Sequence, residues 1–112
     1  MAITNRNQMI DTVTISKGCD IIEQAVQDYV KCAKFVQEAA STCTGEALSV
    51  EKKTMQPTLE ELAGSIKTIP GQVEKITTEI RAAALRIYSK QEEQYEAYLA
   101  ELEAQKNAAS SN

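Results

Sequence analysis

Apolar side chains recur along the first half of the chain at alternating spacings of four and three residues. An average spacing of 3.5 residues places side chains on one side of a helix and is typical of coiled-coil packing against another helix. The positions between them, such as Glu23 and Gln37, are mostly polar, and we expect them to face water. The pattern predicts a helix from about residue 14 to about residue 41, with Thr14 or Ser16 as its N-cap. The apolar residues are Ile15, Cys19, Ile22, Val26, Tyr29, Ala33, Val36, Ala40 and Cys43.

The second half of the chain repeats this pattern and predicts helical segments over about residues 47–106, followed by a flexible tail at 107–112. Its apolar residues are Met55, Leu59, Leu62, Ile66, Ile69, Val73, Ile76, Ile80, Ala83 and Ile87. Beyond Ile87 the stripe shifts by one residue, to Tyr88, Tyr95, Leu99 and Leu102, which rotates the apolar face.

Eight aliphatic residues of the two halves form the predicted partner-binding seam. We expect them to be buried within the chain or across an oligomer, and we expect Ile76→Asp to cost several kcal/mol because it would bury an unpaired charge. The eight residues are Ile22, Val26, Val36, Leu62, Ile66, Val73, Ile76 and Ile80.

Residues 42–46 form the predicted interhelical turn, because Gly45 can adopt the left-handed conformation that ends helices. Pro57 suits the first position of a helix, whereas Pro70 inside a helix costs about 3 kcal/mol. The apolar phase continues across Pro70, so we expect a kink there, with a true break as the alternative. The predicted fold is a single all-α domain, residues 1–112, an antiparallel helical hairpin or coiled-coil-like bundle with a long, Pro70-kinked second helix.

The two predicted helices differ in length. At 1.5 Å per residue, a helix of about 28 residues is about 42 Å long, whereas residues 57–106 would span about 75 Å. Either the chain folds back near Pro70 into a three-helix arrangement, or about 20 residues of the apolar stripe remain uncovered and require a protein partner.

Composition and charge exclude several function classes. The chain has 112 residues, a formal net charge of −4 and no histidine. It has no dense Lys/Arg cluster for nucleic acid and no apolar run of about 20 residues for membrane insertion. The first residues lack the apolar core of a signal peptide. The three cysteines have no metal-ligand spacing, and we expect them to be buried as small apolar residues. We therefore predict no catalytic, cofactor-binding or metal-binding residues, and no enzyme activity.

Two short motifs carry a resemblance to a known family. The predicted turn reads Cys43-Thr44-Gly45-Glu46-Ala47, and the second half contains Tyr88-Ser89-Lys90-Gln91-Glu92. Together with two helices of this size, they resemble the WXG family of type VII secretion, in which a Trp-x-Gly turn joins two helices and a Tyr-x-x-x-Asp/Glu motif follows. Gly45 and Ala47 match the turn, while Cys43 replaces the Trp, which accessory partners of LXG-type toxins also commonly lack.

The resemblance implies a non-enzymatic component of a type VII secretion system, acting as a WXG-like substrate or as a targeting or chaperone partner of a larger secreted toxin. Its partner would be the helical N-terminal domain of that effector, or a second copy of this chain. Tyr88 and Glu92 would be an exposed export signal, and the protein would be cytoplasmic before secretion without a cleaved signal peptide. The alternatives are a cytoplasmic coiled-coil scaffold or chaperone subunit unrelated to secretion, and a needle or rod subunit of another secretion machine.

Overall fold

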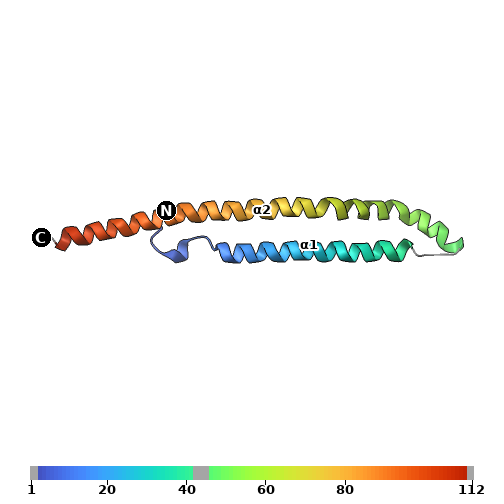
Figure 1. The fold of residues 1–112 in the computed structure, drawn as a ribbon, viewed down its shortest axis with the longest axis horizontal. Helices are drawn as coiled ribbons and strands as arrows, with labels where there is room; N and C mark the ends of the chain where they lie inside the picture. Colours follow the sequence, from blue (N-terminus) through green and yellow to red (C-terminus); the bar gives the residue numbers. More distant parts are fainter. Residues whose placement is uncertain (1–2, 42–45, 111–112) are drawn as a thin grey trace. The chain divides into compact units, whose positions relative to one another are not determined.

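The computed structural model describes residues 3–41 and 46–110. Its elements in chain order are a short 3-10 helix η1 (Arg6–Gln8), helix α1 (Thr12–Ser41) and helix α2 (Glu46–Ser110) (Figure 1). The two long helices pack against each other, and the described residues contain no strand, so the predicted all-α helical hairpin is confirmed. The chain divides into two compact units, the first made of Met1–Lys17 and Glu79–Asn112 and the second of Gly18–Thr78. Each unit is described by itself below.

Helix α1 begins two residues earlier than predicted, because Asp11 caps it. The Asp11 carboxylate accepts the backbone N–H of Thr14 at 3.0 Å and the Thr14 hydroxyl at 2.6 Å. A carboxylate that satisfies an otherwise unpaired N–H in the first turn is a standard N-cap. The predicted caps, Thr14 and Ser16, therefore lie inside the helix, and the prediction of either as the N-cap is wrong.

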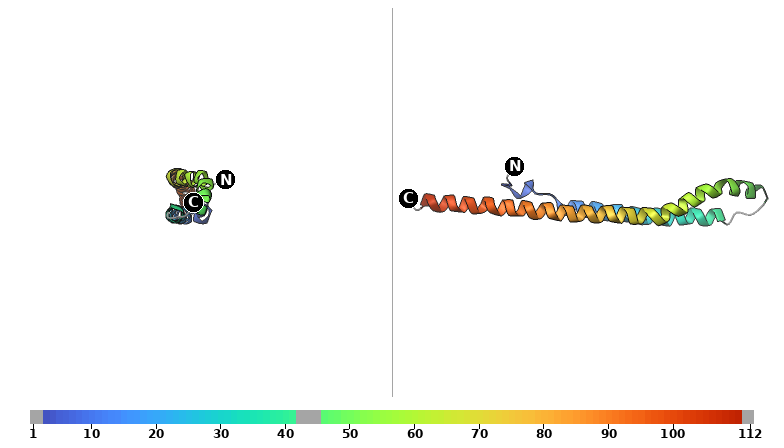
Figure 2. Two further views of the ribbon diagram at one scale, coloured as in Figure 1. Left: turned by 90° about the vertical axis from the view of Figure 1, so that its right-hand side faces the viewer. Right: turned by 90° about the horizontal axis from the view of Figure 1, so that it is seen from above.

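Helix α2 is continuous for 65 residues and contains both prolines. The alternatives of a break or a fold-back at Pro70 are thus excluded, although each proline removes one backbone hydrogen bond. Within the second unit, Figure 2 shows that the green beginning of α2 and its yellow continuation run in different directions. A kink at Pro70 itself stays a prediction. At its other end α2 extends to Ser110, so residues 107–110 are helical where a flexible tail was predicted.

The buried side of α1 in the second unit differs from the predicted stripe at every second position. Cys19 and Ala33 are buried as predicted, but Glu23 and Gln37, which we expected to face water, are half-buried. Their sequence neighbours Ile22 and Val36 are 48% and 54% exposed. The inward stripe of this part of α1 consists of Cys19, Glu23, Val26, Val30, Ala33, Gln37 and Ala40.

The seam residues of α2 divide in the same way. Leu62, Ile66 and Val73 are half-buried, whereas Ile76 and Ile80 are exposed. Thr77, the residue after Ile76, is instead the most deeply buried side chain among the described residues. Burial of the exposed seam residues across an oligomer therefore stays a prediction.

Two further sequence predictions concern the cysteines and the turn. Cys19 is buried, but Cys32 is exposed, so the expectation that the cysteines are buried is wrong for Cys32, which lies beside the inward Ala33 and not on the inward stripe. Cys43 and Gly45 of the predicted turn lie outside the described residues. Ala47 belongs to α2, but its side chain is also outside what the structure describes.

Candidate functional site

The N-terminal segment, residues 3–11, lies beside the orange part of α2 in both Figure 1 and Figure 2. It has a local structure of its own. The Asn5 side chain accepts the Asn7 N–H at 2.9 Å, and the Gln8 side chain accepts the backbone N–H groups of Thr4 at 2.8 Å and of Asn5 at 3.2 Å. This reciprocal capping box closes the η1 turn. The segment is therefore a defined element that can present specific groups to α2.

Two specific contacts hold the N-terminal segment on α2 within the first unit. The backbone N–H of Ile10 donates to Oε1 of Gln91 at 2.7 Å. The guanidinium carbon of Arg6 lies 5.1 Å from the centre of the Tyr95 ring, within the range of a cation–π interaction. The Ile3 side chain is buried as well. A polar, an aromatic and an apolar contribution thus fix the segment.

Tyr88, the first residue of the predicted export motif, lies at this contact. It lines an open hollow of about 360 Å³ together with Arg6, Asn7, Met9, Ile10 and Asp11. Tyr88 and Glu92 are both half-buried, so each is partly covered where we expected an exposed pair. The sequence did not reveal this because the short run around Met9 and Ile10 has no helical period, and nothing in it indicates the element that it contacts.

Asp11 connects the N-terminal segment to α1, and its charge is stabilised locally. The pKa of Asp11 lies below its ordinary value of 3.8, chiefly because its carboxylate accepts the Thr14 hydroxyl and then the Thr14 N–H. Hydrogen bonds to the ionised form favour that form. The Asp11 carboxylate is therefore ionised at neutral pH, the form that accepts both hydrogen bonds from Thr14.

The second unit contains a polar pair where the sequence predicted an apolar seam. The Thr77 hydroxyl donates to Oε1 of Glu23 at 2.6 Å, which joins α2 to α1. The hydroxyls of Tyr29 and Ser65 form a second hydrogen bond between these helices at 2.7 Å. Hydrogen bonds between specific partners define the register of the two helices more closely than interchangeable aliphatic contacts do.

The same unit presents apolar side chains to solvent. Ile22, Ala25, Val26, Tyr29 and Ile69 line an open groove of about 310 Å³. Large apolar side chains outside this groove are exposed as well, namely Ile21, Phe35, Val36, Met55 and Ile76. Exposed apolar side chains beside an open groove are typical of surfaces that bind another protein.

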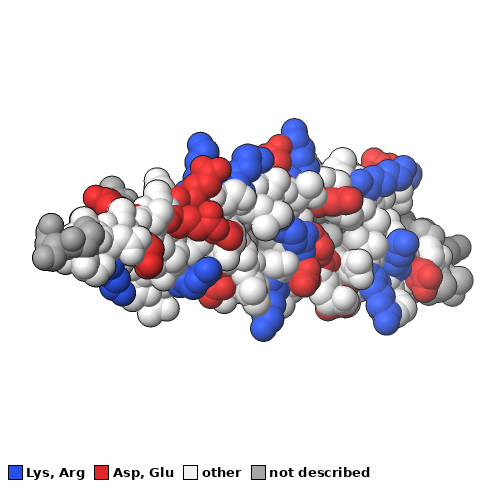
Figure 3. Space-filling model, turned by 60° about the vertical axis from the view of Figure 1, so that its left-hand side comes forward, with Lys and Arg blue, Asp and Glu red and all other residues white. Residues whose placement is uncertain are grey.

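Basic side chains and metal-binding side chains provide no other candidate site in the described part of the chain. On the face in Figure 3, Lys and Arg side chains are interspersed with Asp and Glu and form no continuous basic stripe. Across residues 3–41 and 46–110, no group of three or more Cys, Asp or Glu residues is placed to hold a metal ion. None of the helices over these residues is long and apolar enough to span a bilayer.

Comparisons of the sequence with protein-family models and with curated proteins, and of the fold with solved structures, found no match.

Proposed function

We propose that this chain is a non-enzymatic, protein-binding component of a type VII secretion system, either a WXG-like substrate or a targeting partner of a larger secreted toxin. The observation that carries the protein-binding part is the exposed apolar surface of the second unit, above all the groove at Ile22, Tyr29 and Ile69. A hairpin of two helices covers only one side of each helix. A helical domain of another protein, laid along the groove, would remove these side chains from water.

The assignment to type VII secretion rests on the helical hairpin together with Tyr88 and Glu92. Both residues lie on α2, and a spacing of four residues places them one turn apart on the same face. The proposed partner is the helical N-terminal domain of an effector, as the resemblance implies. In this proposal the groove of the second unit binds the partner, and the Tyr88–Glu92 region of the first unit is the export signal.

The two roles can be tested separately in cells that carry the secretion system. Tyr88→Ala and Glu92→Ala should abolish secretion while the partner still co-purifies. Ile22→Asp and Ile76→Asp should weaken co-purification of the partner, because each places a charge on the exposed apolar surface. Secretion is measured as the ratio of protein in the culture supernatant to folded protein in the cells, with a strain lacking the secretion ATPase as the blank.

Matched controls lie next to the tested residues. Glu93→Ala removes an exposed acid beside the half-buried Glu92, and Tyr98→Ala removes another half-buried tyrosine of α2. Both should be secreted normally. If Tyr88→Ala melts early and loses its partner while export per folded molecule stays normal, Tyr88 is only a packing residue and the export role is wrong. Release that does not depend on the secretion ATPase, or no release at all, would favour the cytoplasmic scaffold.

A further inference from the structure

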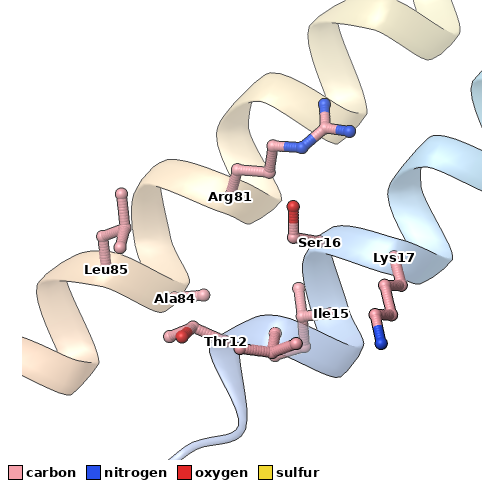
Figure 4. A pocket seen from close by; sticks show the side chains of 8 residues that line it. Thr12, Ile15, Ser16, Lys17, Arg81, Ala84 and Leu85 are labelled. Atoms are coloured by element: carbon pink, nitrogen blue, oxygen red, sulfur yellow. The ribbon is translucent and has the colours of Figure 1, made fainter.

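The first unit contains a second apolar hollow, of about 380 Å³, between the beginning of α1 and the middle of α2. Figure 4 shows that α1 supplies Thr12, Ile15, Ser16 and Lys17, while α2 supplies Arg81, Ala84 and Leu85; Val13 completes the lining. Ala84 is buried, but Val13 and Leu85 are exposed. The hollow thus combines uncovered aliphatic side chains with two cations, Lys17 and Arg81.

The distal segment of α2, residues 99–110, has the complementary chemistry. Every residue in it is exposed, and its two large apolar side chains, Leu99 and Leu102, are one turn apart. Glu101 and Glu103 flank Leu102, and Lys106 is the first cation within the segment. This is an acidic helix with an i, i+3 pair of leucines, the pattern by which helices bind in apolar grooves.

The distal segment cannot fill the hollow of its own chain. Leu85 and Leu99 lie on one continuous helix, and 14 residues of helix separate them by about 21 Å. The occupant must therefore come from another molecule. Because the hollow is cationic and the segment is anionic, a second copy of this chain supplies both halves of the contact.

We propose that the distal segment of α2 docks into the hollow of a second copy, and that the reciprocal contact forms a two-fold symmetric dimer. Such an interface uses the same surface of both chains. The two α2 helices of such a pair run antiparallel, so a step toward the N-terminus in one copy pairs with a step toward the C-terminus in the other. Arg81 lies four residues before Leu85, and Glu103 lies four residues after Leu99. The register that places Leu99 on the other copy's Leu85 therefore also places Glu103 beside its Arg81.

Three further points concern residues close to these contacts. Leu102 falls opposite Ala82, whose small side chain leaves room for a leucine. Arg81 already interacts within its own chain, but a guanidinium has five donors and can serve a second carboxylate. The two Glu92 residues come near the two-fold axis, where their repulsion opposes association, so Glu92→Gln should strengthen the dimer.

The test is sedimentation equilibrium of the full chain over a range of concentrations. We expect a monomer–dimer equilibrium. Leu99→Asp with Leu102→Asp should raise the dimer dissociation constant at least about tenfold, and so should Val13→Asp with Leu85→Asp, because each pair removes central apolar contacts. Leu85 is 60% exposed and Leu99 44% exposed, so we expect the folded chain to tolerate these changes. Circular dichroism of each variant checks that its helix content is unchanged.

Mixing and charge exchange make the test specific. A mixture of the two double variants should form dimers again, since one intact contact remains between them. Arg81→Glu and Glu103→Arg should each weaken the dimer, and the combination should restore it. Ile21→Asp, on the second unit, is the control and should leave the dimer unchanged.

Three outcomes would overturn the proposal: a monomer at every concentration, a dimer that survives the distal-segment variant, or a dimer lost in Ile21→Asp. If the chain is a monomer, the remaining candidate to bind in the hollow is an acidic helix of a different protein. Since no secretion assay enters, this result is independent of the proposed function.

Discussion

Thr77→Val is the sharpest test of the packing inside the second unit. Thr77 is 1% exposed, and its hydroxyl donates to Oε1 of Glu23 at 2.6 Å, closer than to the backbone oxygens of Val73 at 3.1 Å and Glu74 at 3.2 Å. Valine keeps the β-branched shape and removes only the hydroxyl. The half-buried Glu23 oxygen then loses this donor. A hydrogen bond to a charged group contributes about 1.5–3 kcal/mol, so we expect the free energy of unfolding to fall by about that amount.

The assay is urea unfolding, followed by far-ultraviolet circular dichroism at one fixed protein concentration, because association would shift the midpoint. Thr68→Val is the matched control on the same helix. The Thr68 hydroxyl is exposed and donates to the Gly64 carbonyl of its own helix. We expect this change to alter the free energy of unfolding by no more than about 0.5 kcal/mol.

A double variant separates the hydrogen bond from simple packing. Replacing Glu23 with Leu as well as Thr77 with Val removes both groups of this hydrogen bond. An apolar pair in place of a polar pair often leaves a protein as stable as the original or more so. The double variant should therefore be more stable than Thr77→Val alone. If Thr77→Val unfolds like Thr68→Val, or if the effects of the two substitutions simply add, the Glu23–Thr77 bond does not stabilise the hairpin as we argue.

Two further predictions concern Ile76 and Asp11. Ile76 is 54% exposed, so Ile76→Asp should change the free energy of unfolding of the dilute protein by no more than about 0.5 kcal/mol, in contrast to the several kcal/mol that the heptad pattern implied. A large loss in urea unfolding at low concentration would show that Ile76 is buried within its own chain. For Asp11, whose folded-state pKa is lowered, the cap contributes stability above pH 3.8 that is lost as the pH falls through the lower folded-state pKa. Asp11→Ala should therefore melt at a lower temperature than the parent at neutral pH, with a difference that narrows below pH 3.8, and a difference that does not depend on pH would contradict the charged cap.

The sequence predicted the helices well but not which residues face inward. The period of the apolar pattern is a property of the helix itself, so helix α1 and the helical nature of α2 followed directly. The phase of the pattern, that is, which residues of each turn face inward, depends instead on the contact between the two helices. After Cys19, both the third residue, Ile22, and the fourth, Glu23, lie on the near side of a helix. Hydrophobicity favours Ile22, whereas the structure buries Glu23, because a hydroxyl from Thr77 meets it.

The contact around Tyr88 could not be predicted for a different reason. The N-terminal segment has no repeating pattern. It contacts α2 through a backbone N–H and a guanidinium, and its Ile3 side chain is buried. Sequence spacing carries no information about contacts between residues about 80 positions apart, such as Ile10 and Gln91, which are separated by 81. The capping box at Asn5 and Gln8 and the Asp11 cap were local signals that a closer reading of capping residues could have found.

The position of the Glu23–Thr77 bond bears on how a partner would affect the chain. Each polar residue is directly preceded in sequence by an exposed isoleucine, Ile22 before Glu23 and Ile76 before Thr77. A partner helix that covers these isoleucines would also exclude water from the neighbourhood of the bond. Because electrostatic interactions strengthen as the local dielectric constant falls, the bond would become stronger in the complex than in the free hairpin. Thr77→Val should then reduce partner affinity in addition to stability, whereas Thr68→Val should change neither.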